Sequence, residues 1–211
     1  MNKQITELNQ ILTDHITEQC RNKKHILLTL TGGMDSRLIL SILLKQGIQP
    51  DVITWYKKPI DLDIARHISQ DLKLNHIILY HPEEKGWSQT ATHIIDSYDI
   101  VLYGELISEV FNKFVRWTES EKKLNQIIDN FFKYAKKHYK YQQGGNRCYP
   151  CMDTEVMKTI YKLPIYQRMY GYTNRHLIKI NQPSLLKYPH TCVNLRYRLI
   201  EKLYWIFIPL L

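Results

Sequence analysis

Residues 26–38 constrain this chain more than any other part of it. An apolar run, Ile26–Leu30, leads into the sequence Thr-Gly-Gly-Met-Asp-Ser at positions 31–36, and a second apolar stretch of helical character follows. This order predicts a buried strand, a glycine turn and the first turn of a helix. Such a turn offers backbone N–H groups, and the helix dipole adds partial positive charge. Phosphate is therefore the expected ligand.

The turn is not a Walker A loop, because no Gly-Lys-Ser/Thr follows at the required spacing, and it lacks the GxGxxG pattern of dinucleotide-binding folds. It resembles the loop Ser-Gly-Gly-x-Asp-Ser of the N-type ATP pyrophosphatases (the PP-loop proteins), with a threonine that keeps the hydroxyl of the first serine. The resemblance implies that five residues form the ATP-binding loop: Thr31, Gly32, Gly33, Asp35 and Ser36. The Asp35 carboxylate would repel a phosphate, so it would act by holding a Mg²⁺ that bridges to the phosphate. The alternative is an ordinary strand–turn–helix joint in which Asp35 and Ser36 serve as an N-cap pair.

The composition indicates a globular chain with an acidic partner. Of its 211 residues 44% are hydrophobic, and its formal net charge is +9, which suits ATP, pyrophosphate or RNA. The basic cluster at 133–140 is interpreted as a solvated helix face, so nucleic acid is not an expected partner. Four cysteines and a polar N-terminus predict a reduced, cytoplasmic protein. The apolar tail, residues 203–211, is too short to cross a membrane.

Strands and helices alternate along the first 120 residues. Four short apolar runs predict strands: His25–Leu30, Asp51–Trp55, His76–Tyr80 and Asp99–Tyr103. Helical patterns cover 3–19, 37–46, 61–72 and roughly 87–97, and later 154–161, 172–180 and 194–207. We predict an α/β fold with a doubly wound, mostly parallel sheet, which resembles the adenine nucleotide α-hydrolase-like folds. Residues 1–120 would form the nucleotide-binding core, and 121–211 a helical portion packed on it in one continuous domain.

Three further stretches resemble the synthetase domain of asparagine synthetases. Residues 61–76 are similar to the segment after that family's second strand, and residues 104–111 to its Gly-Glu-Gly-x-Asp-Glu-x-Phe motif. Residues 147–155, followed by Leu163-Pro164, resemble its Arg-x-Pro-Phe-Leu-Asp segment. The resemblance implies an ATP-dependent, amide-forming ligase. Such an enzyme activates a carboxylate as an acyl-adenylate, releases pyrophosphate and passes the acyl group to an amine.

The same resemblance implies roles for individual residues, with ATP and Mg²⁺ as cofactors. Asp35 and Glu109 would bind Mg²⁺, and Thr54 and Trp55 would frame the adenosine. Glu105 would lie near the reacting amine as a base or orienting group. Lys187 is the candidate for the late lysine that stabilises the reacting intermediate. The expected partners are a carboxylate substrate and an amine or ammonia donor.

The chain departs from this family at several positions. The aspartate that shares Mg²⁺ falls on Ser108, a weak neutral ligand, and no Lys-x-Gly pattern surrounds Lys187. Position 2 is Asn2, where glutamine-dependent members carry a nucleophilic cysteine. We therefore expect the amine to come from free ammonia, a separate amidotransferase subunit or another amine substrate. A non-catalytic, nucleotide-binding descendant of the family is the alternative.

Three cysteines leave another function open. Cys148 and Cys151 form a CxxC pair and Cys192 follows, a set that resembles the iron–sulfur ligands of some PP-loop tRNA sulfurtransferases. The competing interpretation is that the pair occupies buried apolar positions, since a single CxxC is a weak metal signal.

Overall fold

The computed structural model describes residues 3–55, 58–79, 89–105, 107–112, 121–139, 145–168 and 171–190. The elements before residue 113 are α1 (Lys3–Cys20), β1 (Ile26–Thr29), α2 (Met34–Lys45), β2 (Asp51–Trp55), α3 (Pro59–Asp71), β3 (His76–Leu79), α4 (Gln89–Asp96), β4 (Ile100–Leu102) and α5 (Ile107–Asn112). The later ones are α6 (Glu121–Tyr139), β5 (Arg147–Cys148), the 3₁₀ turn η1 (Pro150–Met152), α7 (Thr154–Lys162), α8 (Ile165–Arg168), α9 (Tyr172–Asn181) and the 3₁₀ turn η2 (Pro183–Lys187). The helix expected at 194–207 and Cys192 lie outside the described residues.

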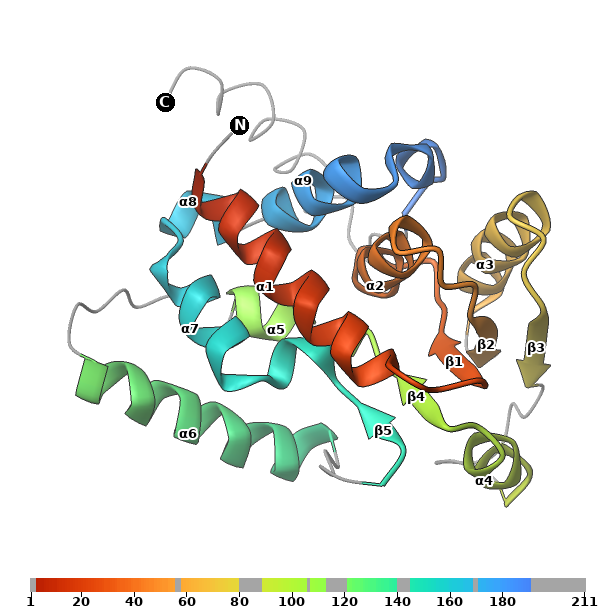
Figure 1. Ribbon diagram of the computed structural model, residues 1–211, viewed down its shortest axis with the longest axis horizontal. Coiled ribbons are helices and arrows are strands. Elements are labelled where there is room, and N and C mark those ends of the chain that lie inside the picture. The colour runs from red at the N-terminus through yellow and green to blue at the C-terminus, as the bar shows by residue number, and fades with distance from the viewer. Residues whose placement is uncertain are drawn as a thin grey trace.

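The strands form one parallel sheet, in the order β3-β2-β1-β4-β5 (Figure 1). This confirms the predicted fold class. In the central strand, Leu28 pairs with Val52 of β2 and with Leu102 of β4. The chain runs outward from β1 to β3 and returns to β4 on the other side of β1. Open α/β sheets bind ligands at the carboxyl ends of the strands beside such a reversal.

Helices cover both faces of the sheet, so the predicted doubly wound arrangement is also confirmed. Successive side chains of a strand point to opposite faces. Leu28 of β1 belongs to the larger core, which holds apolar side chains of α1, α2, α3 and α9. Leu27 belongs to a smaller cluster with Ile95 of α4 and Val101 of β4. The helices α1, α2, α3 and α9 therefore cover one face of the sheet, and α4 covers the other.

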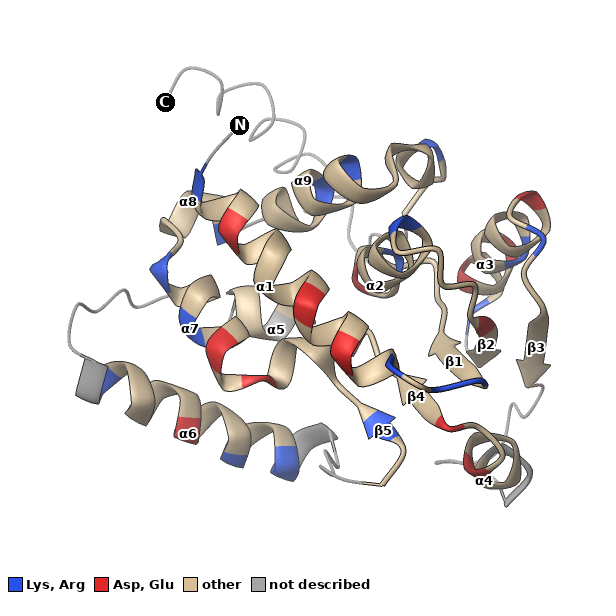
Figure 2. Ribbon diagram, viewed as in Figure 1, with Lys and Arg blue, Asp and Glu red and all other residues tan. Residues whose placement is uncertain are grey.

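The helices after residue 120 pack on this core. α9 contacts α2, α7 contacts α1, and α6 contacts α7 (Figure 1). On α6, Phe131 and Ala135 are buried, whereas Lys133, Lys136 and Lys137 are exposed. Lys and Arg are spread over α3, α6, α7 and α9 (Figure 2). This distribution agrees with a solvated basic face on α6.

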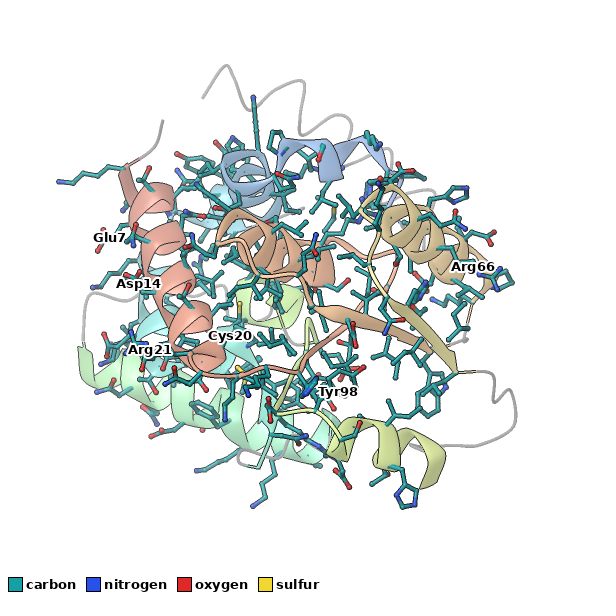
Figure 3. The ribbon with its side chains drawn as sticks, turned by 45° about the vertical axis from the view of Figure 1, so that its right-hand side comes forward. Glu7, Asp14, Cys20, Arg21, Arg66 and Tyr98 are labelled. Carbon is teal, nitrogen blue, oxygen red and sulfur yellow. The ribbon has the colours of Figure 1, made fainter. Side chains whose placement is uncertain are left out.

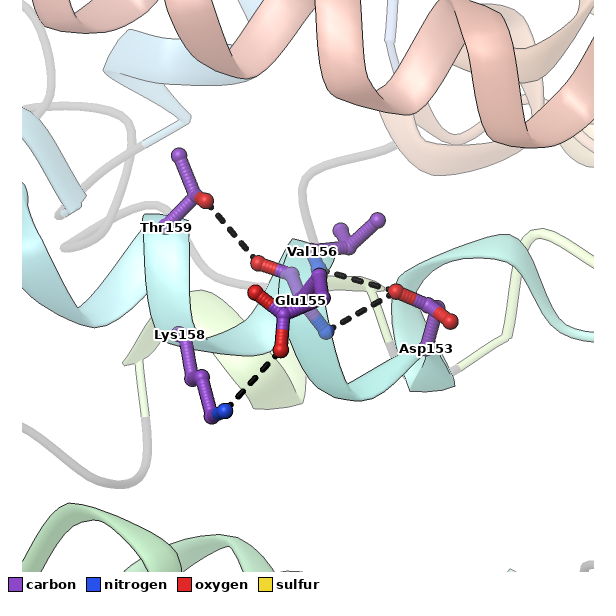
Figure 4. A network of polar contacts seen from close by, with 5 residues as sticks. All are labelled: Asp153, Glu155, Val156, Lys158 and Thr159. Atoms are coloured by element: carbon purple, nitrogen blue, oxygen red, sulfur yellow. Dashed lines mark hydrogen bonds and ion pairs between the residues drawn. The ribbon is translucent and has the colours of Figure 1, made fainter. Parts of the chain in front are cut away.

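Two helices show how the sequence sets local structure. α1 is amphipathic: Glu7 and Asp14 are exposed, and Cys20 at its end is buried (Figure 3). α7 begins at an aspartate cap, because the Asp153 side chain accepts hydrogen bonds from the backbone N–H groups of Glu155 and Val156, at 2.9 and 3.0 Å (Figure 4).

None of the helices in the described part of the chain is apolar over a length that would span a bilayer.

Three of the differences between the observed elements and the sequence prediction have a clear physical cause. α2 begins at Met34 rather than at residue 37, because the helix starts directly after the glycine turn. The strand β5 was not predicted, since two residues are too few to show a strand pattern. The helix α5 was not predicted either, because residues 104–111 were interpreted as a loop motif.

Candidate functional site

The glycine turn follows the central strand and is closed by two hydroxyl groups. The backbone N–H of Thr31 donates to Ser36 Oγ at 3.1 Å, and the two side-chain oxygens lie 3.3 Å apart. The N–H of Gly33 donates to Thr31 Oγ1 at 3.2 Å. Thr31 and Ser36 therefore fix the shape of the turn from its two ends.

α2 begins at this turn without a capping side chain. Its N-cap is Gly33, in an extended conformation, and a glycine has no side chain that could cap the helix. The alternative interpretation of Asp35 and Ser36 as an N-cap pair is therefore wrong. A helix start without a capping side chain is a favourable place for an anion, because the backbone donors and the dipole act in the same direction.

Asp35 joins α2 to two other elements. Its Oδ1 accepts a hydrogen bond from Ser108 Oγ at 2.8 Å and another from Asn174 Nδ2 at 2.7 Å. Its Oδ2 accepts from the backbone N–H of Ser108 at 3.1 Å. Asn174 lies on α9 and is buried. The carboxylate thus holds the start of α2 against α5 and α9.

Gly104 brings β4 against the same helix start. A Cβ at this position would lie 2.7 Å from both the Cα and the N of Ser36, and 3.1 Å from the carbonyl carbon of Asp35. These are backbone atoms, which cannot move aside as a flexible side chain would. Only glycine therefore allows the turn after β4 to approach the glycine turn this closely.

Arg37 supports the glycine turn from inside the protein. Its side chain is fully buried, and its Nε and Nη2 donate to the carbonyl oxygens of Gly33 and Gly32, at 3.1 and 2.6 Å. Burial, together with the nearby charge of Arg175, lowers the pKa of Arg37 to about 10. The guanidinium stays protonated at neutral pH.

The two residues proposed to frame adenosine lie at the carboxyl end of β2. Thr54 is fully buried, and its hydroxyl donates to the carbonyl oxygen of Leu30 at 2.8 Å. Because that proton is used, His76 Nε2 is the donor in the 2.8 Å contact with Thr54 Oγ1. Trp55 is half-buried. The Thr54 side chain therefore ties strands together, and Trp55 is the more accessible of the two.

The remaining predicted site residues occupy different surroundings. Glu105 is exposed and follows β4 directly, at the same end of the sheet as the glycine turn. Glu109 lies on α5, but its side chain falls outside the described residues. Lys187 Nζ lies 2.8 Å from Asp71 Oδ2 in an exposed ion pair between η2 and the end of α3. Its expected catalytic role stays a prediction.

The cysteine pair lies in the hydrophobic core. Cys148 and Cys151 are both buried among apolar side chains, as the hydrophobic interpretation expects. Burial raises the pKa of Cys148 to about 12 and the pKa of Cys151 well above the ordinary value of a thiol. Protonated thiols are poor metal ligands. Cys192 lies outside the described part of the chain.

A cavity of about 560 Å³ lies elsewhere, along α3 and the edge strand β3. Its lining includes Arg66, seen on α3 in Figure 3, together with Lys73 and His76. The residues predicted to bind nucleotide do not line it. The candidate site is therefore the region around the glycine turn rather than this cavity.

Sequence reasoning missed two residues of the site, Arg37 and Asn174. Arg37 carried a usable signal, because it directly precedes the apolar run Leu38–Leu40, and in the structure it is buried together with that run. Asn174 carried none. It is 139 residues from Asp35 in the sequence, and only the folded chain brings the two together.

The role of Thr31 can be tested by two substitutions. Thr31→Ala should weaken ATP binding several-fold and cost about 1 kcal/mol of stability, since the alanine cannot accept from the Gly33 N–H. Thr31→Ser keeps the hydroxyl and should keep the affinity. Isothermal titration calorimetry with ATP measures both. Equal affinities for the two variants would show that the hydroxyl does not shape the turn.

The buried thiols give a second prediction. In the native protein at pH 8, iodoacetamide should label Cys20, Cys148 and Cys151 slowly, because burial excludes the reagent and raises the pKa of Cys20 to about 11. In denaturant all three should react quickly. Peptide mapping by mass spectrometry separates them from Cys192. Rapid native labelling of Cys148 would argue for an accessible cysteine centre.

Comparisons with known proteins identify no family. No protein-family model matches the chain, and no curated protein matches it significantly. Among solved structures, the chain is similar to the NMN synthetase from Francisella tularensis, with 14% sequence identity and a TM-score of 0.40. The similarity covers 95% of this chain and 92% of that one. A similarity of this strength carries no information about activity.

Proposed function

We propose that the chain is an ATP-dependent ligase that forms an amide through an acyl-adenylate and releases pyrophosphate. The observation that carries this proposal is the glycine turn at the end of the central strand, followed by a helix without a capping side chain. Backbone donors there could hold the departing pyrophosphate. The ordered resemblance of four sequence segments to asparagine synthetases supports the choice of reaction.

The arrangement of the other residues is compatible with this chemistry. Glu105 lies at the end of β4, beside the reversal of strand order, where an amine and an activated acid would meet. An exposed carboxylate at that place can orient an amine or accept its proton. Trp55, at the end of β2, offers an aromatic surface to the adenine base.

Magnesium fits the described residues poorly. Asp35 already accepts three hydrogen bonds, and Ser108 supplies a hydroxyl where a second carboxylate would be needed. Among the described residues, no three His, Cys, Asp or Glu side chains are grouped to hold a metal ion. We therefore propose that Mg²⁺ arrives with the phosphates of ATP and meets the carboxylate of Asp35, with Glu109, whose side chain is not among those described, kept as the second predicted ligand.

The reaction can be tested directly. The purified chain is incubated with ATP, Mg²⁺, ammonia and each of a broad panel of carboxylic acids, and AMP and pyrophosphate are measured. We expect equal amounts of both with the correct acid. ATP binding without AMP or pyrophosphate for any acid would overturn the ligase proposal, and so would ADP and phosphate as products.

A second candidate is a nucleotide-binding protein without turnover. The observation that favours it is the hydrogen bonding of Asp35 to Ser108 and Asn174, which occupies the carboxylate that the family uses for metal. Calorimetry with ATP in the presence of Mg²⁺ or of EDTA distinguishes the two. Equal affinities in both conditions, together with no pyrophosphate release, would favour the protein without turnover.

A further inference from the structure

Arg37 joins the glycine turn to a segment near the end of the described chain. Besides its two bonds to the turn, its Nη1 donates to the carbonyl oxygens of Tyr188 and Leu185, at 2.9 and 3.4 Å, and its Nη2 donates to that of Pro189. A guanidinium has five N–H groups, so all of them donate to backbone carbonyls. Two of these carbonyls belong to the turn and three to residues 183–190, which we call the closing segment.

These bonds orient the turn. In a planar trans peptide the C=O and N–H groups point in opposite directions. Because the carbonyls of Gly32 and Gly33 point at Arg37, the N–H groups of Gly33 and Met34 point to the other side of the turn, where the Gly33 N–H donates to Thr31 Oγ1. Arg37 therefore holds the Met34 N–H in the direction that an anion would need.

The charge of Arg37 is also poorly compensated. It is buried, and its five acceptors are neutral carbonyls rather than carboxylates. Its pKa is lowered by this burial. A buried cation of this kind gains from an anion placed nearby. A phosphate bound at the turn would supply that negative charge. The peptide groups of the turn would lie between the phosphate and the Arg37 guanidinium.

The closing segment has a second anchor on the protein surface. Asp71, the last residue of α3, accepts hydrogen bonds from Lys187 Nζ at 2.8 Å and from the Tyr188 hydroxyl at 2.6 Å. The segment is thus held by Arg37 through its backbone and by Asp71 through its side chains. The two anchors can be removed independently.

We propose that Arg37 is a positioning residue that couples the glycine turn to the closing segment, so that phosphate binding and docking of this segment strengthen each other. Coupling between two events is reciprocal: an anion that favours the docked segment is itself bound more tightly when the segment is docked. This inference rests on the proposed function only in taking the turn as a phosphate site.

The first test removes the surface anchor. Asp71→Ala should increase hydrogen exchange in residues 183–190 and weaken ATP binding about fivefold, a shift within the usual range of coupling between sites. Asp63→Ala removes a carboxylate from an exposed position of the same helix and should change neither quantity. Because Asp71 is exposed, its variant keeps the core intact. Unchanged ATP affinity together with a loosened segment would overturn the coupling.

The second test addresses Arg37 itself. In the wild-type chain, ATP should slow exchange in residues 183–190, and Arg37→Lys should abolish this effect, since a lysine ammonium has three donors for five carbonyls. Arg168→Lys alters another buried arginine, whose guanidinium lies over the Tyr161 ring, and should keep the ATP-dependent protection. It controls for general loss of stability.

The outcomes separate this inference from the proposed function. If ATP binds the wild-type chain, releases pyrophosphate with some acid and yet leaves exchange in residues 183–190 unchanged, the ligase proposal stands and the coupling is wrong. If ATP does not bind the wild-type chain, both proposals are wrong. Slower exchange in the segment without any pyrophosphate release supports the coupling and argues against the ligase.

Discussion

Pyrophosphate release should fall at least about 100-fold when Asp35 is replaced by asparagine, the size of loss expected when a site is misplaced by about 1 Å. The asparagine keeps the shape of the side chain but loses the charge. Its amide group would also present N–H donors where Asp35 accepts hydrogen bonds from Ser108 and Asn174. At least one donor would then face another donor.

The same substitution should lower the free energy of unfolding by about 2 kcal/mol, the cost of leaving a partly buried donor unsatisfied. Chemical denaturation measures this loss. Ser108→Ala is the matched control. It removes the hydroxyl bond at 2.8 Å but keeps the carboxylate and its bonds to the Ser108 N–H and Asn174. We expect a loss of about 1 kcal/mol and little change in turnover.

The pair of variants decides what Asp35 does. Reduced stability with unchanged ATP affinity in Asp35→Asn would show that the carboxylate only joins α2 to α5 and α9. Reduced ATP affinity beyond that of Ser108→Ala would show that its charge or its position matters to the nucleotide. ATP titrations at one Mg²⁺ concentration for both variants make the comparison.

The sheet could be predicted from sequence because its signal is local. Each of the four predicted strands is a short apolar run, and the run at 26–30 is buried on both faces of the sheet. The alternation with helices then implies a parallel sheet. The fifth strand, β5, could not be predicted, because Arg147 and Cys148 form a strand only by pairing with Val101 and Leu102. The local sequence does not show this pairing.

The site could be predicted only in part. The glycine turn was found because its composition is unusual, but the direction of each side chain depends on contacts distant in sequence. Thr54 was expected to face the nucleotide, yet its hydroxyl bonds to Leu30 and His76 inside the sheet. Lys187 was expected at the reacting groups, and its ion pair with Asp71 became visible only in the fold.

Replacing Gly104 with alanine should separate the turn after β4 from the glycine turn at the start of α2. The added methyl group would meet the backbone of Ser36 at 2.7 Å, so the turn after β4 must move away from the start of α2. Overpacking of this kind costs about 1–3 kcal/mol. Because Glu105 follows Gly104 directly and Ser108 lies four residues after Gly104, the movement should shift Glu105 and pull Ser108 away from Asp35, and we expect pyrophosphate release to fall about 100-fold.

Gly47→Ala provides the matched control for this loss. Gly47 follows α2 with a φ of +73°, and a Cβ there would meet nothing within 4 Å. Alanine at that position should cost about 1 kcal/mol through backbone strain alone, at the far end of the helix from the turn. Both variants would be less stable, but only Gly104→Ala should lose turnover, because only Gly104 sets the distance between β4 and α2. Equal turnover in the two variants would mean that the close approach of these backbones does not hold the site together.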